Sequence, residues 1–371
     1  MRKSAVSGLI FANSDDSKLK KLTENRSMGS VPFGARYRVI DFTLSNLVNA
    51  GVTSVGIVTK ENYRSLMDHV GSGVSWDLDR KNGGLYLIPP YYKKGVKKYT
   101  GTISALYAAV DYIERCGSEY MVLCDSHVIA NVEISEALEQ HKANNADITI
   151  VYCDDDLPQE SYEKMVISVD EDKKVTKMSF DSGSGKVLFG IGITIINREL
   201  LVGLIKQAVE DDLVNFTRDV IAKKLKTLKV YGFEHKEFIA VMDNSHTYYQ
   251  ASMALLDSEV RKQLFNPERP IYTKVRDSMP TRYGTKSSVK NCLIGDDCVI
   301  DGTVKNSIIF RGVKVEKGAV VENCILMQET VVGKDAQLDN VIADKNAVIG
   351  EKMILKGTTA RHSFVKKNQV L

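Results

Sequence analysis

The sequence has 371 residues, a length that accommodates about two domains, each with its own buried core. Hydrophobic residues make up 43% and charged residues 26%, which is typical of an ordinary globular protein. The net charge of +3 gives no case for binding nucleic acid or a membrane by charge alone, and no apolar run approaches the roughly 20 residues that span a bilayer.

Segments up to about residue 265 alternate between strand-like and helix-like patterns. A basic start is followed by a short apolar stretch, which we interpret as a first strand ending at Ala12 and not as a signal peptide, because a strand–loop–helix pattern follows. This alternation predicts an α/β domain over residues 1–265, with a mostly parallel sheet and one crevice beyond the carboxyl ends of its strands. The clearest runs are strands at 54–59, 120–125 and 146–153 and helices at 104–116 and 134–145.

A different period begins after a proline-rich connection. Residues 266–285 form the predicted linker, since "QLFNPERPIYTKVRDSMPTRYG" (263–284) holds three of the seven prolines. Residues 286–371 then repeat at spacings of 15 to 17 residues, with glycines where corners are needed. We predict a left-handed parallel β-helix of hexapeptide repeats, with four to five coils. The repeat is marked by Asn291, Asn306, Asn323 and Asn340, and by aliphatic residues Ile309, Val315, Val321, Leu326, Val332, Leu338, Ala343 and Ile349.

The six cysteines have no CxxC spacing, and the six histidines are equally dispersed. This pattern predicts reduced thiols in a cytoplasmic protein and no metal cluster built from side-chain nitrogen or sulfur. Cys292 and Cys324 fall at equivalent places two coils apart, so their thiols are expected about 10 Å apart, too far for a disulfide.

Three stretches resemble one known family along nearly the whole chain: "VPFGARYRVIDFTLSNLVNAGVTSVGIVT" (31–59), "GTISALYAAVDYI" (101–113) and "RPIYTKVRDSMPTRYG" (269–284). They resemble bacterial ADP-glucose pyrophosphorylase, also called glucose-1-phosphate adenylyltransferase. The resemblance implies a Rossmann-like nucleotidyltransferase domain before the β-helix. In that family glucose 1-phosphate and ATP give ADP-glucose and pyrophosphate, a reaction that needs magnesium and cationic side chains.

The family's triphosphate loop is altered in this chain. By the resemblance, its three glycines fall on Asn13, Ser14 and Asp16, and its arginine falls on Lys18. Each replaced glycine adds a Cβ where the backbone must approach phosphate closely. Carboxylates at Asp15 and Asp16 also oppose a polyanion, at about 1 to 4 kcal/mol each for surface-like dielectrics.

Other positions implied by the resemblance are altered as well. A loop lysine of the family falls on Met28, and the lysine that grips the sugar phosphate falls on Asp181. One metal-binding carboxylate is kept as Asp125. The second falls on Val241 in an ungapped alignment, with Asp243 two residues on.

These changes predict a largely non-catalytic, regulatory or structural subunit of a hetero-oligomeric ADP-glucose pyrophosphorylase in glycogen biosynthesis. It resembles the D-type subunit, and we expect a tetramer in which the catalytic partner binds the magnesium and this chain has no cofactor of its own. An alternative is a slow adenylyltransferase that uses Lys18, Asp125 and Asp243. A hexapeptide-repeat acyltransferase finds little support, because His362 is the only histidine after residue 246 and lies beyond the regular coils.

Simpler interpretations accompany these hypotheses. Asp125 is either a magnesium ligand or, as we favour, a strand-end carboxylate that caps the following turn. The lysine- and tyrosine-rich stretch 88–99 is interpreted as a solvated loop over the crevice in preference to a nucleic-acid or effector site. A basic tail offers a site for a small phosphorylated effector, although a solvated terminus is the commoner outcome. Its residues are Arg361, His362, Lys366 and Lys367.

Overall fold

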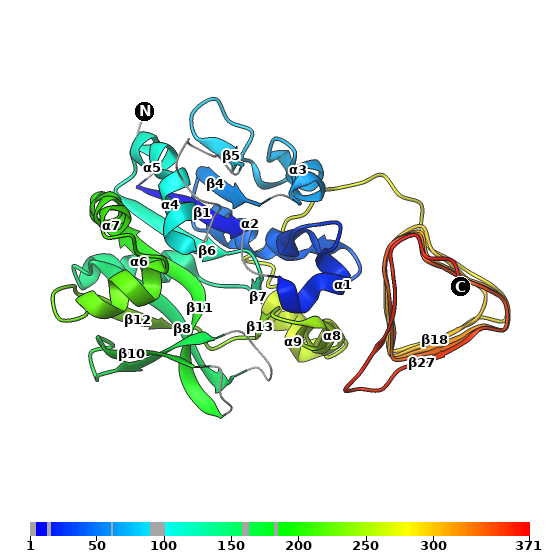
Figure 1. The fold of residues 1–371 in the computed structure, drawn as a ribbon. Helices are drawn as coiled ribbons and strands as arrows, with labels where there is room; N and C mark the ends of the chain where they lie inside the picture. Colours follow the sequence, from blue (N-terminus) through cyan, green and yellow to red (C-terminus); the bar gives the residue numbers. More distant parts are fainter. Residues whose placement is uncertain (1–4, 13–15, 61, 90–100, 158–162, 182–184) are drawn as a thin grey trace.

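The computed structural model describes residues 5–12, 16–60, 62–89, 101–157, 163–181 and 185–371. It has two parts, an α/β domain and a triangular β-helix, which Figure 1 shows on the left and right. Both parts of the predicted fold class are therefore confirmed. In the described parts of the chain, no helix is long and apolar enough to cross a membrane.

A nine-stranded sheet forms the centre of the α/β domain, in the order β10-β9-β11-β6-β1-β4-β5, with β8 on β11 and β12 on β8. Strands β6, β1, β4 and β5 are mutually parallel, and β11 runs antiparallel to β6. The strands are β1 Val6–Ala12, β4 Ser54–Thr59, β5 Gly84–Ile88, β6 Tyr120–Asp125, β8 Ile148–Asp156, β9 Lys164–Val169, β10 Val175–Asp181, β11 Lys186–Asn197 and β12 Val230–Glu234. The strands predicted at 54–59 and 120–125 thus have the expected bounds.

Helices cover both faces of this sheet and bury two separate hydrophobic cores. The helix predicted at 104–116 is divided at Ala109 into α4 Thr102–Ala108 and α5 Val110–Cys116, which pack with α7 on one core. Helices α2 and α6 supply the other core. The remaining bounds are α1 Lys20–Thr23, α2 Val39–Asn49, α3 Arg64–Val70, α6 Ile134–Ala143, α7 Arg198–Glu210, α8 Ser245–Ala254 and α9 Ser258–Leu264, with 3₁₀ turns Ser17–Leu19, Met28–Ser30, Val74–Trp76 and Ala222–Lys224 and a π-helix Phe216–Ile221.

Two small antiparallel ribbons complete the α/β domain. Strand β7, Val128–Ala130, pairs with β13, Ile239–Val241, and so brings the segment before α8 next to the end of β6. Strands β2, Pro32–Phe33, and β3, Tyr37–Arg38, form the second ribbon. The first ribbon is what places Asp243 near Asp125, although 117 residues separate them in the sequence.

The β-helix consists of three parallel sheets with five strands each, so it has five coils. Every aliphatic residue of the predicted inward series is at most 2% exposed, which confirms the period. The first sheet holds β14 Arg282–Tyr283, β17 Val299–Ile300, β20 Lys314–Val315, β23 Val331–Val332 and β26 Val348–Ile349. The second holds β15 Ser288–Lys290, β18 Thr303–Lys305, β21 Val320–Glu322, β24 Gln337–Asp339 and β27 Ile354–Lys356; the third holds β16 Leu293–Ile294, β19 Ile308–Ile309, β22 Ile325–Leu326, β25 Val341–Ala343 and β28 Ser363–Val365.

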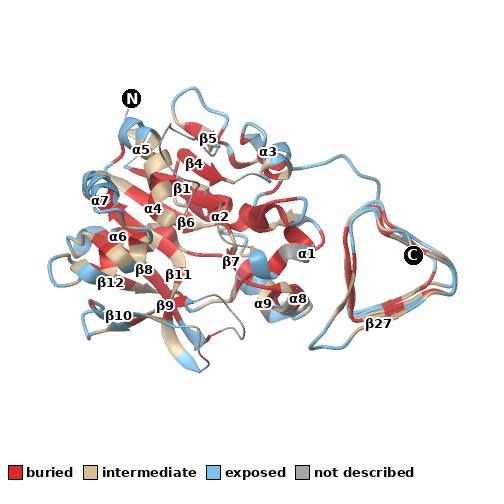
Figure 2. Cartoon of the chain, in the orientation of Figure 1, coloured by how far each residue is buried: buried red, intermediate tan, exposed pale blue. Residues whose placement is uncertain are grey.

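Between α9 and β14 the chain has no helix or strand, and its first part lies along the α/β domain. The Asn49 side chain donates to the carbonyl of Pro270, and the amide of Tyr272 donates to the Ser45 hydroxyl. A third hydrophobic core is shared by the two domains, with residues such as Leu22 and Tyr248 packed with Met327. Burial thus continues from the central strands to the side of the domain that faces the β-helix (Figure 2).

Candidate functional site

A cavity of about 440 Å³ lies beyond the carboxyl ends of β1 and β6. We call it the sheet pocket, and its polar lining includes Asp125, His127, Glu163, Lys164, Asn215, Arg218 and Asp243. The end of β6 is fixed by backbone contacts, since the amide of Ser126 donates to the carbonyl of Phe11 and the Thr43 hydroxyl donates to that of Asp125. The predicted crevice is therefore present at the expected edge of the sheet.

Asp125, Val241 and Asp243 all line the sheet pocket, so both candidates for the second carboxylate position, the aligned Val241 and the nearby Asp243, lie at this cavity. Asp125 ends β6 and packs against Gly192, where a Cβ would stand 2.4 Å from Oδ2 of the carboxylate. Burial raises the pKa of the Asp125 carboxyl above its usual range. The nearby Asp243 carboxylate also raises this pKa, whereas His127 and Lys164 lower it.

The Asp243 carboxylate is held by Lys164, a residue that sequence reasoning missed. The Lys164 ammonium donates to Oδ1 at 2.9 Å and lies 2.7 Å from Oδ2. Asp243 is only 1% exposed, and Nε2 of His127 lies 3.9 Å from its Oδ1. A lysine at the first position of β9 is typical of a solvated strand end, so no local pattern indicates that this side chain points into the pocket.

The segment that the resemblance assigns to the phosphate loop is described, after Ala12, only from Asp16 onward. The Asp16 carboxylate forms an ion pair with Lys60 at 2.6 Å, and this pair joins the loop after β1 to the segment after β4. Lys18 is exposed in the 3₁₀ turn Ser17–Leu19. Asn13, Ser14 and Asp15 lie outside the described residues, so their predicted place in the loop stays a prediction.

Met28 and Asp181 differ in their relation to the sheet pocket. Met28 is buried and lines it, so an apolar thioether occupies the position where the resemblance places a lysine. Asp181 is exposed at the end of β10, and its neighbour Phe180 lines the pocket in its place. Asp181 is the register partner of Lys164 on the adjacent strand, so the cation lies across the strand pair from the predicted position.

Arg218 provides a second cation that the sequence did not reveal. Its guanidinium pairs with Glu163 and lies over the Phe180 ring, 4.7 Å from the centroid. Both contacts depend on the π-helix Phe216–Ile221, which carries Arg218 to the pocket wall. A group of three or more histidine, cysteine, aspartate or glutamate side chains that could hold a metal ion is absent from the described residues.

A second cavity, also about 440 Å³, lies between the two domains. We call it the basic interdomain pocket, because it is lined by Arg36, Arg38, Arg261, Lys274, Arg276, Arg311 and Lys345 and by only two acidic residues, Asp296 and Glu329. Burial, together with the charges of Arg38 and Arg26, lowers the pKa of Lys345 to about 7. Accumulated positive charge of this kind favours an anionic ligand.

The predicted basic tail lies near this pocket without lining it, since the charge of Lys367 contributes to the lowered pKa of Lys345. His362 stacks on Tyr249, with ring centroids 3.7 Å apart, and burial lowers its pKa to about 4. Lys366 lies 3.6 Å from a carboxylate oxygen of Glu24. The His362 ring packs against α8 of the α/β domain, whereas Lys366 stays largely exposed, and none of the four tail residues lines the basic interdomain pocket.

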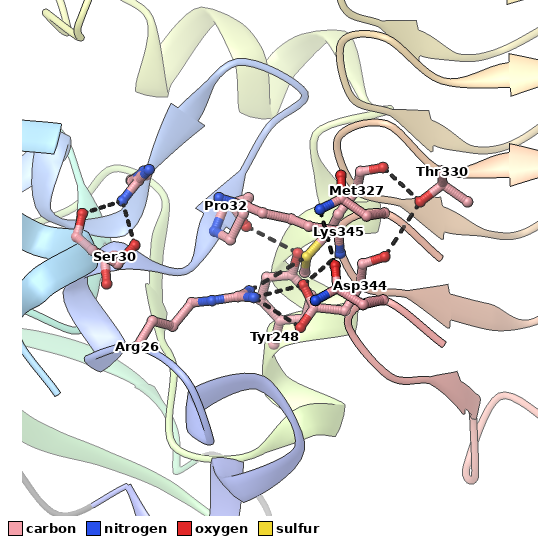
Figure 3. Close-up of polar contacts among 12 residues, drawn as sticks. Arg26, Ser30, Pro32, Tyr248, Met327, Thr330, Asp344 and Lys345 are labelled. Carbon is pink, nitrogen blue, oxygen red and sulfur yellow. Dashed lines mark hydrogen bonds and ion pairs between the residues drawn. The ribbon is translucent and has the colours of Figure 1, made fainter. Parts of the chain in front are cut away.

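The domain interface beside that pocket contains a buried ion pair (Figure 3). Nη2 of Arg26 donates to both carboxylate oxygens of Asp344 at 2.8 Å, and Nη1 lies 3.8 Å from the sulfur of Met327. Next to it, the Tyr248 hydroxyl donates to the carbonyl of Pro32 at 2.9 Å. The contacts of Arg26 connect the segment after α1 to the last coils of the β-helix, whereas the Tyr248 contact lies within the α/β domain.

Comparisons with known proteins agree with this architecture. The family described as "Nucleotidyl transferase" matches residues 7–179, and the family described as "GlmU-like, C-terminal hexapeptide" matches residues 277–363. The "Glycogen biosynthesis protein GlgD" of Bacillus subtilis (strain 168) is 34% identical over 311 residues, which cover 84% of this chain and 81% of the relative. The protein of the same name from Geobacillus stearothermophilus is 36% identical over 315 residues, covering 85% and 82%.

An enzyme is similar over the same span. The "Glucose-1-phosphate adenylyltransferase" of Geobacillus stearothermophilus is 32% identical over 331 residues, which cover 86% of this chain and 84% of the relative. Both domains and the linker are included in alignments of this coverage. The chain therefore belongs to the glucose-1-phosphate adenylyltransferase family, together with the glycogen biosynthesis GlgD proteins.

Proposed function

We propose that this chain is a largely non-catalytic, regulatory or structural subunit of a hetero-oligomeric ADP-glucose pyrophosphorylase in glycogen biosynthesis. Its partner is the catalytic subunit, which binds magnesium and joins ATP to glucose 1-phosphate in the cytoplasm. We expect the assembly to be a tetramer. The chain contributes to activity through shared interfaces, as a coupling between subunits and not through chemistry of its own.

The observation that carries this proposal is the Asp16–Lys60 ion pair at the mouth of the phosphate loop. A triphosphate that enters this loop meets a carboxylate where the family has a glycine. It also competes with that carboxylate for Lys60. At a few ångströms and a surface-like dielectric, one such repulsion weakens binding by about 1 to 4 kcal/mol. Met28 adds to the effect, because a thioether cannot neutralise phosphate charge.

One observation favours the alternative, a slow adenylyltransferase. Asp125 and Asp243 line the same pocket, so two carboxylates remain near the position of the reacting phosphates. In this alternative, Asp125, Asp243 and Lys18 are the catalytic residues of the slow enzyme. The two functions differ in what the isolated chain does.

A pyrophosphate-release assay separates them. The purified chain is tested alone, then with its cognate catalytic subunit, and the catalytic subunit is also tested at doubled concentration as a control for protein mass. We expect negligible ADP-glucose formation by the chain alone and a gain above the doubled control in the mixture. The Asp125→Ala variant should stimulate the catalytic subunit to the same extent as the parent chain does. Steady turnover by the chain alone that Asp125→Ala abolishes would establish the slow enzyme instead.

We further propose that the basic interdomain pocket, and not the basic tail, receives a small phosphorylated effector. Six arginine and lysine side chains, together with Lys345 at a pKa of about 7, line a cavity between the two domains against two carboxylates. A ligand there contacts both domains and could therefore change how they meet. Isothermal titration with a sugar bisphosphate, compared between the parent chain and Arg276→Ala, tests this; equal heats from both would rule the site out.

A further inference from the structure

Lys164 places a positive charge directly against the Asp243 carboxylate, inside the sheet pocket. Its ammonium is within 2.9 Å of both carboxylate oxygens, and its side chain is 10% exposed against 1% for that of Asp243. Two such distances leave no oxygen of Asp243 outside the reach of the ammonium. Asp243 is therefore neutralised by a group that belongs to the chain itself.

The surrounding acidic residues are arranged in the same way. Glu163, next to Lys164 on the pocket wall, is paired with Arg218. Asp125 faces the same cavity from the end of β6, with His127 two residues later. Of the three carboxylates that line the described part of the sheet pocket, two thus form ion pairs with side chains of the pocket wall.

This arrangement does not fit a divalent metal ion. Mg²⁺ requires oxygen ligands at about 2.0–2.1 Å in near-octahedral geometry. An ion at either oxygen of Asp243 would lie within a few ångströms of the Lys164 ammonium, in a pocket where water screens the repulsion poorly. Binding would require Lys164 to leave a buried partner, which is unfavourable because it strands a charge.

We propose that Lys164 is a resident cation that excludes divalent metal from the Asp125–Asp243 carboxylate pair. The chain thereby keeps both carboxylates, Asp125 and Asp243, while the Lys164 ammonium neutralises the second. The inference rests on the proposed function for its view of the sheet pocket as a former nucleotide site. It adds that the loss of metal binding has a specific and reversible cause.

The test is a Mn²⁺ titration of the full chain, with free Mn²⁺ followed by electron paramagnetic resonance. Mn²⁺ is the probe because it shares the oxygen ligands of Mg²⁺. We expect no stoichiometric binding by the parent chain at millimolar Mn²⁺, and one equivalent bound at least about tenfold more tightly by Lys164→Met. Lys164→Arg, which keeps the charge, should behave like the parent chain.

The double variant Lys164→Met/Asp243→Asn is the matched control. It removes both charges of the buried pair, so it should fold and should lose the gained Mn²⁺ site. If Lys164→Met does not fold, Lys164→Gln removes the charge while keeping a hydrogen-bond donor to Asp243. Added Mn²⁺ should also raise the melting temperature of the single variant and leave that of the double variant unchanged.

Two results would overturn the inference. One is a Mn²⁺ equivalent bound by the parent chain and lost in Asp243→Asn. The other is equal, weak binding by the parent chain and by the folded Lys164→Met or Lys164→Gln variant. Neither result bears on the pyrophosphate-release assay, so the two proposals can fail separately. A chain that binds Mn²⁺ at Asp243 and makes no ADP-glucose contradicts the metal exclusion only. Turnover without metal at Asp243 contradicts the non-catalytic role only.

Discussion

Arg26 and Asp344 lie 318 residues apart in the sequence and form a buried ion pair across the domain interface. One guanidinium nitrogen lies 2.8 Å from both carboxylate oxygens, and both side chains are at most 4% exposed. Removing one partner of such a pair strands the other as a buried charge, whereas removing both does not. The ion pair therefore makes the two domains depend on each other for stability.

The first prediction concerns this pair. Arg26→Met should lower the free energy of unfolding in urea by about 3–5 kcal/mol, because the Asp344 carboxylate stays buried without its guanidinium partner and keeps the Lys345 amide as a donor. Arg26→Met/Asp344→Asn should recover most of that loss. A single variant as stable as the parent, or a double variant no more stable than the single one, would show that the pair contributes little.

A second prediction follows from the buried His141. Its ring accepts from or donates to the Thr149 hydroxyl at 2.8 Å, the residue is 1% exposed, and burial lowers its pKa to about 4. The unfolded chain then binds the proton more tightly than the folded one. Stability is fully present above the unfolded value of about 6.5 and is lost as pH falls toward 4, by about 2 kcal/mol between pH 7 and pH 5.

The measurement is urea unfolding of the parent chain and of His141→Asn at pH 7 and pH 5. The asparagine keeps a polar contact for Thr149 but does not titrate. The loss in free energy of unfolding between pH 7 and pH 5 should be smaller in His141→Asn than in the parent chain, by about 2 kcal/mol. A variant whose stability falls as steeply with pH as that of the parent would assign the pH dependence to other groups.

The third prediction compares two glycines. A Cβ at Gly302, in the β-helix, would lie 2.4 Å from the carbonyl oxygen of Ala319 in the next coil. A Cβ at Gly203, exposed within α7, meets nothing within 4 Å. Gly302→Ala should therefore destabilise the protein, whereas Gly203→Ala should stabilise it by about 0.5–1 kcal/mol through helix propensity. Melting temperatures measured side by side check both signs; a loss of stability in Gly203→Ala would contradict the second.

The β-helix could be predicted from sequence because its period is local and repeated. The corners differ from the expectation in one respect. Only Gly312 and Gly318 have a positive φ among the six glycines predicted at corners, which are Gly295, Gly302, Gly312, Gly318, Gly333 and Gly350. The recurrent asparagines take the left-handed conformation themselves, with φ between 44° and 53°; they are Asn291, Asn306, Asn323 and Asn340. Other glycines, such as Gly302, are needed for the close approach of the next coil.

The candidate site was predicted less completely, for a physical reason. Asp125 could be placed because it ends a strongly apolar strand, and strand ends converge at one edge of the sheet. The direction of the Lys164 side chain depends on β9 pairing with β10 and β11, which no local pattern encodes. The contact between Arg26 and Asp344 likewise depends on how the α/β domain and the β-helix pack together, which neither local pattern encodes. Local patterns located the carboxylate at the strand end, and tertiary packing decided its neighbours.

The last prediction concerns the Asp16 carboxylate. Replacing Asp16 by glycine removes a negative charge and a Cβ from the loop and releases Lys60 from its ion pair. Restoring Met28 to lysine adds a cation at the pocket wall. The double variant Asp16→Gly/Met28→Lys should bind magnesium–ATP at least about tenfold more tightly than the parent chain by calorimetry, since a single unit repulsion is about 1 to 4 kcal/mol. The double variant Glu171→Gln/Asp172→Asn, exposed in the turn between β9 and β10, changes the net charge by the same two units and should leave affinity unchanged. Tight nucleotide binding by the parent chain itself would mean that the Asp16–Lys60 pair does not close the loop to polyanions.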